Sequence, residues 1–289
     1  MPLDPRSGDL SGSSSRALAE VLSRPRMEVL PFDGIEEEVR ANLATDARVT
    51  VTASPRKGLE ATLALSERLA RAGYTAVPHL SARLVRDRAH LEEVLVRLRD
   101  AGVRELFVPA GDATAAAGEF AGAAELLEAM GPLRAEFDEV GITGYPESHH
   151  LISDPDTIRA MFEKEPMATC IVSQICFDAG TIRAWIEAVR ERGTSLPIWI
   201  GLPGVVNSRK LMRISMKIGL GRSARFLGHN RGWVPRLLTR QFKPDRLVRE
   251  LAPVVEDPQT GVAGFHLYTF NEVARTERWR RHTVEQLRG

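Results

Sequence analysis

Polar side chains stand inside or directly after several short apolar runs, which is the pattern of a site built on buried strands. The most informative is Glu28, which precedes the apolar run 29–32. A carboxyl group buried beside such a run has a raised pKa and can act as a general acid near neutral pH. The alternative is a solvated glutamate at the start of an ordinary strand.

Other residues with useful chemistry occupy comparable positions along the chain: His79, Asp112, Tyr145, Glu147, Gln174, His266, Tyr268 and Asn271. Gln174 lies within an apolar run, where an unpaired amide is costly, so it needs a protein partner or a ligand. His79 could equally be a satisfied histidine of the core. Asp112 and Asp178 could be N-caps of the helices that follow them.

A metal site is not predicted. His149 and His150 supply two candidate ligands, but a zinc site needs further ligands at a useful spacing, and the sequence does not reveal them. The two cysteines, Cys170 and Cys176, lie in one apolar run. They exclude a disulfide framework or a cysteine-rich zinc site and fit a reducing compartment.

The composition indicates a cytoplasmic protein with a full-sized core. The chain has 289 residues, of which 43% are hydrophobic and 27% charged, with a formal net charge of +1. A charge near zero argues against a dedicated nucleic-acid binder. No run reaches the ~18 apolar residues of a membrane span, and the N-terminus lacks the apolar segment of a signal peptide. We expect no nucleic-acid or membrane partner, and leave the oligomeric state open, a monomer included.

Positive charge is concentrated between residues 209 and 249, where 12 Lys or Arg accompany Asp245 as the one acidic residue. This basic block suits an anionic ligand such as a phosphate group, a polycarboxylate tail or a nucleic acid. The alternative is a solvated helix face.

Short β-rich runs alternate with helical patterns, which predicts βα units. The runs span 28–32, 48–54, 76–80, 105–109, 140–145, 169–177, 197–202 and 264–270. The helical patterns span 58–72, 87–101, 119–130, 154–163, 180–192, 208–218 and 271–287. Eight strands within about 260 residues match an α/β fold of the (β/α)8 TIM barrel type. The nearly continuous apolar character of the runs predicts strands that are buried on both faces.

A doubly wound parallel sheet is the alternative fold. Neither a GxGxxG motif after the first run nor a GxxxxGK[ST] motif occurs in the sequence, which weakens that alternative. The segment before the last strand is longer than a barrel loop. Patterns at 234–239 and 246–251 predict extra helices inserted there.

The domain organisation follows from the same patterns. Residues 5–15 are rich in Ser and Gly and have the composition of a flexible segment. We expect a flexible N-terminal tail over residues 1–20 and a single barrel domain, carrying the catalytic site, over residues 21–289.

Six short motifs occur in order at the predicted strand ends. They are Glu-Val-Leu-Pro from residue 28, Pro-His-Leu from 78, Gly-Asp from 111, Gly-Tyr-Pro-Glu-Ser-His from 144, Gln-Ile-Cys-Phe-Asp from 174 and Gly-Phe-His-Leu-Tyr-Thr-Phe-Asn from 264. Their joint order and spacing, over about residues 27–280, resemble the methylenetetrahydrofolate reductase family. The resemblance implies a TIM-barrel oxidoreductase of one-carbon metabolism and methionine biosynthesis. Such an enzyme reduces methylenetetrahydrofolate to methyltetrahydrofolate with NAD(P)H, usually through bound FAD.

The resemblance also implies a role for each matching residue. Glu28 matches the acid that opens the five-membered ring of the folate, and Asp112 matches an aspartate near the flavin and the pterin. Gln174 and Tyr268 match residues that contact the folate. The positions that line the flavin pocket are matched by His79, Tyr145 and Glu147.

The sequence departs from the family in its first motif, where the family has Glu-Phe-Phe-Pro-Pro and 28–32 reads Glu-Val-Leu-Pro-Phe, and at two strand ends. The fourth strand of the family usually ends Leu-Arg-Gly-Asp, whereas 109–112 reads Pro-Ala-Gly-Asp and lacks the arginine that contacts the flavin. The second usually ends in an aromatic residue and glycine, whereas 53–58 reads Ala-Ser-Pro-Arg-Lys-Gly. The losses concentrate on the flavin side, while Glu28, Asp112 and Gln174 are kept. This pattern is similar to the short actinobacterial branch of the family and implies an enzyme without flavin.

Without a flavin, NADH and the folate must be bound together, with the donor and acceptor carbons about 3–3.5 Å apart. Glu28 would protonate the ring nitrogen while the iminium carbon accepts the hydride. Arg56, Lys57 or the basic block would hold the phosphates of NADH or the glutamate tail of the folate. NADPH is an equally open donor. The alternatives are the same reaction through bound FAD, and a non-catalytic barrel that binds folate or a nucleotide.

Overall fold

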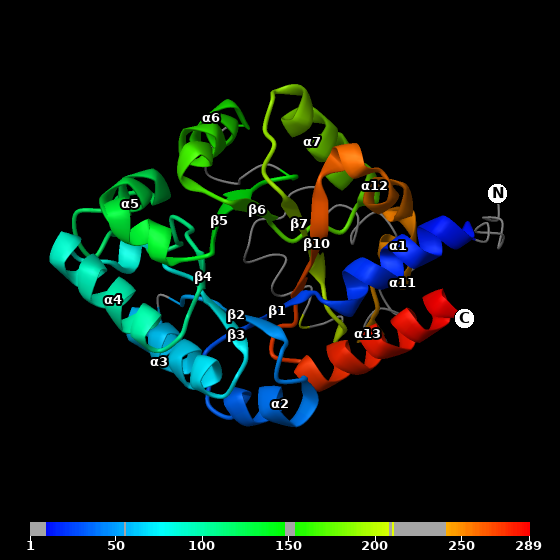
Figure 1. Ribbon diagram of the computed structural model, residues 1–289, viewed down its shortest axis with the longest axis horizontal. Coiled ribbons are helices and arrows are strands. Elements are labelled where there is room, and N and C mark those ends of the chain that lie inside the picture. Colours follow the sequence, from blue (N-terminus) through cyan, green and yellow to red (C-terminus); the bar gives the residue numbers. More distant parts are fainter. Residues whose placement is uncertain (1–9, 55, 148–153, 208–209, 211–240) are drawn as a thin grey trace.

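The computed structural model describes residues 10–54, 56–147, 154–207, 210 and 241–289. Eight parallel strands form one sheet in the order β3-β2-β1-β10-β7-β6-β5-β4. A parallel bridge between His79 and Phe107 joins β3 to β4. Figure 1 shows the strands at the centre with the helices arranged around them. The predicted (β/α)8 TIM barrel is confirmed.

The barrel strands are β1 (Arg26–Val29), β2 (Arg48–Val51), β3 (Thr75–Pro78), β4 (Glu105–Phe107), β5 (Glu139–Gly144), β6 (Cys170–Ser173), β7 (Ile198–Pro203) and β10 (Val262–Tyr268). The α-helices are α1 (Gly12–Ser23), α2 (Ile35–Asn42), α3 (Gly58–Arg71), α4 (Arg88–Asp100), α5 (Ala123–Met130), α6 (Asp154–Lys164), α7 (Ala179–Glu191), α11 (Asp245–Glu250), α12 (Ala252–Glu256) and α13 (Val273–Arg288). Four 3₁₀ turns, η1 (Ala82–Leu84), η2 (Gly131–Glu136), η3 (Glu165–Met167) and η4 (Pro258–Thr260), and a two-stranded ribbon of β8 (Val206–Asn207) and β9 (Gln241–Phe242) complete the description.

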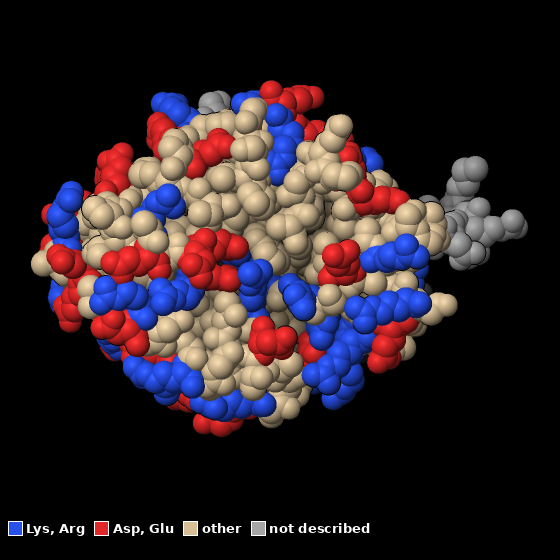
Figure 2. Space-filling model, in the orientation of Figure 1, with Lys and Arg blue, Asp and Glu red and all other residues tan. Residues whose placement is uncertain are grey.

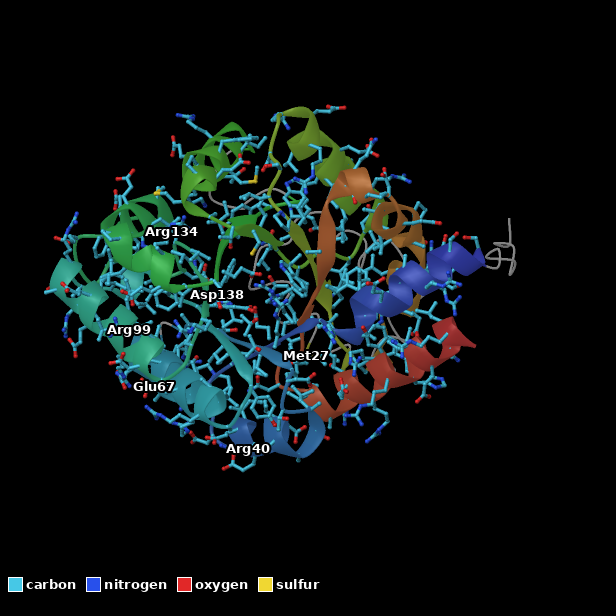
Figure 3. All side chains as sticks on the ribbon, in the orientation of Figure 1. Met27, Arg40, Glu67, Arg99, Arg134 and Asp138 are labelled. Carbon is cyan, nitrogen blue, oxygen red and sulfur yellow. The ribbon has the colours of Figure 1, made fainter. Side chains whose placement is uncertain are left out.

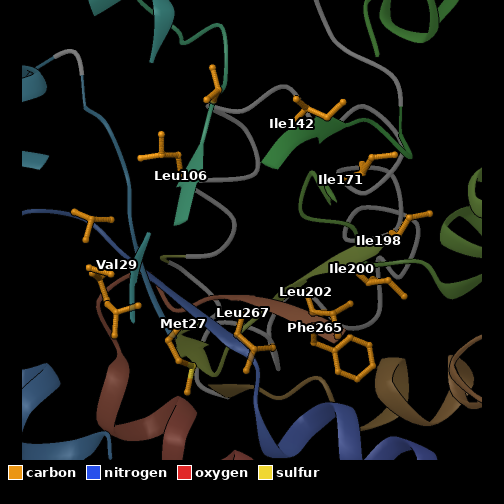
Figure 4. Close-up of a cluster of buried hydrophobic side chains, with 14 of the residues drawn as sticks. Met27, Val29, Leu106, Ile142, Ile171, Ile198, Ile200, Leu202, Phe265 and Leu267 are labelled. Carbon is orange, nitrogen blue, oxygen red and sulfur yellow. The ribbon is translucent and has the colours of Figure 1, made fainter. Parts of the chain in front are cut away.

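The two faces of the barrel strands differ in chemistry. Alternate residues of each strand belong to a large apolar cluster shared with the helices, as Met27 and Val29 of β1 do. Figure 4 shows part of this cluster, drawn from β1, β4, β5, β6, β7 and β10. The intervening residues of β1 are Arg26 and Glu28, both buried. The strands are therefore buried on both faces, as predicted, but one face carries charged side chains.

Several buried charges gather where the strands begin. The guanidinium of Arg26 is fully buried, pairs with Glu139 and lies 3.9 Å from a carboxylate oxygen of Glu105. Its Cζ lies 4.3 Å from the ring centre of Trp199, a cation–π arrangement. Burial lowers the pKa of Arg26, although the neighbouring Glu105 opposes this. The start of the barrel is thus closed by paired charges over an aromatic ring.

Helix ends and interhelical ion pairs follow simple local rules. Asp178 is the N-cap of α7 and accepts a hydrogen bond from the backbone N–H of Thr181 at 2.7 Å, so its capping interpretation is confirmed. In the outer ring of helices, Arg97 of α4 pairs with Glu67 of α3, and Arg99 of α4 pairs with Glu136 at 2.8 Å. Glu67 and Arg99 are labelled in Figure 3. Figure 2 shows acidic and basic side chains interspersed over one face of the molecule.

The extra helix predicted over 246–251 is present as α11, and α12, which was not predicted, follows it before β10. The predicted helix over 234–239 lies outside the described residues. So does most of the basic block, of which Lys210 and residues 241–249 are described. Lys210 donates to the backbone carbonyl of Phe270 at 2.8 Å and pairs with Glu272 at 3.0 Å.

The N-terminal boundary needs a correction, because α1 begins within the predicted tail. Ser11 caps this helix by accepting from the N–H of Ser14, so the Ser-rich composition is that of a helix start. Leu18 and Leu22 are fully buried, and α1 packs against α12 and α13. In the described part of the chain, residues 12–20 are therefore helical and belong to the folded body. No described helix is long and apolar enough to cross a membrane.

We expect Leu22→Ala to lower the free energy of unfolding by about 2–5 kcal/mol, because it leaves a cavity between α1 and the barrel. Chemical denaturation at equilibrium measures the change. Glu20→Ala, at an exposed position of the same helix, is the matched control. Equal stabilities for the two variants would show that α1 contributes nothing to the core.

Candidate functional site

Glu28 lies at the centre of a cluster of three ionisable side chains from three strands. Its Oε2 lies 2.9 Å from Nε2 of His266 on β10 and 3.6 Å from Nε2 of His79 at the end of β3. The Glu28 side chain is 11% exposed, and His266 is 1% exposed. Glu28 is therefore not the solvated start of a strand. It is a nearly enclosed carboxyl group with one close histidine partner.

The pKa of Glu28 lies below its ordinary value, so the predicted rise is wrong for the free protein. Burial by itself raises this pKa, as expected from the sequence. The hydrogen bond to His266, the proximity of His79 and the hydroxyl of Thr52 act in the opposite direction and outweigh burial. The sequence showed the apolar neighbours along the chain but not these partners across the barrel.

His79 is buried, and burial lowers its pKa to about 4. The nearby carboxylate of Glu28 opposes the shift without cancelling it. The imidazole is therefore neutral near pH 7. Its ring contacts Phe107 edge-on, with the ring centres 4.7 Å apart. His79 thus borders the acid directly, with its Nε2 buried and without a hydrogen-bond partner among the described residues.

Tyr268 lies two residues beyond His266 on the same strand, and the rings contact edge-on at 4.7 Å. Its hydroxyl donates to the backbone carbonyl of Ser173 at 3.1 Å. Burial raises the pKa of Tyr268 well above its usual value, and the charge of Glu28 raises it further. The phenol is therefore a fixed neutral group beside the acid.

Gln174 offers an open hydrogen-bonding atom. Its backbone N–H donates to the carbonyl of Gly144 at 2.7 Å, which holds the residue at the end of β6. Its side-chain Oε1 is buried and has no partner among the described residues. An unpaired buried amide oxygen is costly unless a ligand or water donates to it. This is the state expected of a residue that contacts a bound molecule.

Asp112 and Tyr145 lie near each other beyond the ends of β4 and β5. Burial raises the pKa of Tyr145, and the charge of Asp112 raises it further. Asp112 itself is exposed. Glu147 is buried, and its carboxylate accepts a hydrogen bond from the thiol of Cys176 at 3.2 Å. Burial raises the pKa of the Cys176 thiol, and the charge of Glu147 raises it further.

Arg56 and Lys57 are exposed at the rim between β2 and α3. The Nζ of Lys57 lies 3.8 Å from Asp33 and 5.7 Å from the ring centre of Phe32. Phe32 and Lys57 help to line a cavity of about 270 Å³ between α2 and α3. These contacts place Lys57 beside the loop that follows β1.

The strand ends that depart from the family pattern carry Ala53 and Ser54 after β2, and Pro109 and Ala110 after β4. A flavin dinucleotide needs cationic or hydrogen-bonding side chains for its pyrophosphate. These four side chains supply one hydroxyl and no cation, and the cations at the end of β2 are Arg56 and Lys57, just beyond Ser54. Among the described residues no cluster of three His, Cys, Asp or Glu side chains could hold a metal ion. His149 and His150 lie outside the described residues.

Sequence reasoning noted His266 and Asn271 but gave neither a role. The Asn271 side chain accepts from the N–H of Leu30 at 2.7 Å and donates to the carbonyl of Leu30 at 3.0 Å. It thereby ties the end of β10 to the end of β1. Both Phe270 and Asn271 have positive φ angles, 52° and 62°, a conformation that non-glycine residues rarely adopt. Both His266 and Asn271 lie in the last of the six motifs, and this position was the sequence feature that indicated a role for them.

Comparisons with known proteins bear on what this site does. A family model described as methylenetetrahydrofolate reductase matches residues 35–220. The fold is similar to an uncharacterized protein from Clostridium thermocellum that binds two copies of 5-methyl-5,6,7,8-tetrahydrofolic acid. That match has a TM-score of 0.58 and 8% identity, over 94% of this chain and 99% of the other. An oxaloacetate acetylhydrolase in complex with 3,3-difluorooxalacetate matches with a TM-score of 0.50 and 9% identity, over 97% of this chain and 88% of the other. At such identities the two structures show a shared fold.

We expect Gly201→Ala to destabilise the protein by about 1–3 kcal/mol, because overpacking forces neighbouring groups to move. A Cβ at this position would lie 2.3 Å from the carbonyl oxygen of Ser173 and 2.9 Å from the Tyr268 ring. Thermal unfolding measures the change. Gly12→Ala, where a Cβ meets nothing within 4 Å, is the control. A Gly201→Ala protein as stable as this control would contradict the tight packing around Tyr268.

Proposed function

Because the chain belongs to the methylenetetrahydrofolate reductase family, we propose that it reduces 5,10-methylenetetrahydrofolate to 5-methyltetrahydrofolate with NADH or NADPH as the hydride donor. The observation that carries the proposal is the enclosed carboxyl group of Glu28 between His266 and His79. The similar Clostridium thermocellum protein, which binds 5-methyl-5,6,7,8-tetrahydrofolic acid, supports a folate ligand for this fold.

Glu28 is the general acid in this proposal. Its carboxyl group donates a proton to one nitrogen of the five-membered ring. The bond between this nitrogen and the bridging carbon then breaks, which leaves an iminium at the other nitrogen. The iminium carbon then accepts the hydride and becomes the methyl group. In the free protein the partners of Glu28 favour its carboxylate form. A pterin over the remaining 11% of exposed side chain removes water from it, and further burial favours the neutral acid.

The other site residues bind and orient the substrates. The unpaired Oε1 of Gln174 accepts a hydrogen bond from an N–H of the pterin, and Asp112 binds its polar edge. Tyr268 packs against the folate. On the nicotinamide side we assign His79, Tyr145 and Glu147 to the pocket wall. Arg56 and Lys57, exposed on the rim after β2, bind the phosphates in this proposal.

We further propose that hydride passes directly from the nicotinamide to the folate. Ala53 and Ser54 after β2 and Pro109 and Ala110 after β4 support this, since they lack the aromatic residue and the arginine that the family has beside the flavin. Direct transfer requires both substrates in one complex, with the reacting carbons about 3–3.5 Å apart. No step of the proposed reaction then needs a resident redox group.

We expect Glu28→Gln to retain the fold and to lose most of its activity, by a factor of about 10²–10⁴, because a general acid is removed. Initial rates of NADH oxidation with methylenetetrahydrofolate measure the loss, and circular dichroism checks the fold. Glu37→Gln, at an exposed position of α2, is the control. A Glu28→Gln enzyme within about threefold of wild type would remove Glu28 from the mechanism.

Direct transfer predicts a sequential kinetic mechanism, in which both substrates bind before a product leaves. Double-reciprocal plots at several fixed folate concentrations should therefore intersect. Deuterium from stereospecifically labelled NADH should appear in the new methyl group without exchange into solvent. Parallel lines, or an enzyme-bound chromophore that NADH reduces in the absence of folate, would contradict direct transfer and support a bound flavin.

A further inference from the structure

We propose that His266 positions the acid proton of Glu28 by donating a hydrogen bond through Nε2–H, with its Nδ1 bare. The assignment rests on the proposed function, because it concerns the group that protonates the folate. It is carried by the fully buried imidazole, whose Nε2 lies 2.9 Å from Oε2 of Glu28. The hydrogen bond alone leaves open which of the two atoms carries the hydrogen.

The surroundings of the other ring nitrogen decide between the two tautomers. Nδ1 of His266 is buried and has no hydrogen-bond partner among the described residues. A hydrogen on Nδ1 would be a buried donor without an acceptor, which is costly. The neutral ring therefore carries its hydrogen on Nε2 and donates it to Glu28. The imidazolium form is disfavoured for the same reason, because it too places a hydrogen on Nδ1.

This tautomer determines where the acid proton of Glu28 can reside. Oε2 accepts the hydrogen bond from Nε2–H of His266 and lies 3.6 Å from His79. An acid proton on Oε2 would meet the N–H of His266 head-on. The proton is therefore carried by Oε1, the oxygen that the histidine pair leaves free. The hydrogen bond holds the carboxyl group in one orientation, so that one oxygen alone delivers protons.

The two residues are fixed relative to each other by their strands. β1 and β10 are neighbours in the sheet. The backbone carbonyl of Glu28 accepts hydrogen bonds from the hydroxyl of Thr269 at 2.5 Å and from its N–H at 3.3 Å. On the other side, β7 contributes Gly201, which is paired in register with His266. The distance between Nε2 and Oε2 is therefore set by backbone pairing.

Other titratable groups lie near His266, but Glu28 is the group hydrogen-bonded to its imidazole. From the elements packed around it these are Glu28 and Arg26 on β1, His79 after β3, Tyr268 on β10 and, towards the strand starts, Arg48 on β2. Among these groups, the hydrogen bond of His266 is therefore made to Glu28.

The test compares His266→Leu, which removes the donor, with His266→Gln, whose amide N–H lies about as far from the backbone as Nε2. Activity requires the neutral carboxyl group, so kcat falls as pH rises through the pKa of Glu28. A donated hydrogen bond favours the carboxylate and lowers that pKa. In His266→Leu we expect kcat to drop at least ~10-fold with KM little changed, and the fall in kcat to move to higher pH. In His266→Gln we expect kcat within ~3-fold of wild type and an unmoved pH profile.

His282→Gln, at an exposed position of α13, is the matched control. A glutamine cannot carry an extra proton, so a His266→Gln enzyme as impaired as His266→Leu would show that an imidazolium supplies the proton, and would overturn the proposal. A His266→Leu enzyme with the pH profile of wild type would reduce His266 to a packing residue and would also overturn it.

A second measurement does not depend on activity or on the variants. In ¹⁵N-histidine-labelled wild-type protein, we expect the His266 resonances to show a hydrogen on Nε2 and a bare Nδ1. A signal of the Nδ1–H tautomer or of an imidazolium would overturn the proposal. If the wild-type protein does not oxidise NADH with methylenetetrahydrofolate, the proposed function is refuted. The spectroscopic test of His266 does not depend on that result.

Discussion

The pairing of charges inside the barrel is the constraint on which the rest of the structure depends. Arg26 is fully buried, and a buried ion is tolerated only where other charges and hydrogen-bond partners compensate it. Glu139, Glu105 and the face of Trp199 provide that compensation near the starts of three other strands, β5, β4 and β7. The barrel can therefore close around Arg26 only when these strands are all in register. Glu28 lies on the same face of β1, two residues further along.

This arrangement couples the acid to the apolar core. Side chains alternate along a strand, so a slip of one residue in β1 would turn Arg26 and Glu28 towards the helices. It would also turn Met27 and Val29, which are 2% and 0% exposed, into the charged interior. The slip would place charged side chains in the apolar layer and apolar side chains among the charges. Each of these changes is unfavourable by itself and opposes the slip. The position of Glu28 is thus held by residues that take no part in chemistry.

The barrel was predictable from sequence because βα alternation is a local signal repeated along the chain. Glu28, Gln174 and Tyr268 were identified from short motifs, and the structure brings Glu28 and Tyr268 onto adjacent strands. The direction of the pKa shift of Glu28 could not be predicted from the sequence, because its partner His266 lies 238 residues away along the chain. The helix α1 was missed for a different reason, since a Ser-rich helix start has the composition of a flexible tail.

The sheet order shows when the acid site can form. β10 is the last strand in the chain and lies between β1 and β7. It supplies both His266 and Tyr268, and Asn271 just beyond it is hydrogen-bonded to Leu30 at the end of β1. Bringing such distant segments together costs chain entropy that only the completed barrel recovers. The positive φ angles at Phe270 and Asn271 add local strain, and the two hydrogen bonds to Leu30 offset it. The pairing of the first and last strands therefore both completes this part of the barrel and brings His266 to Glu28.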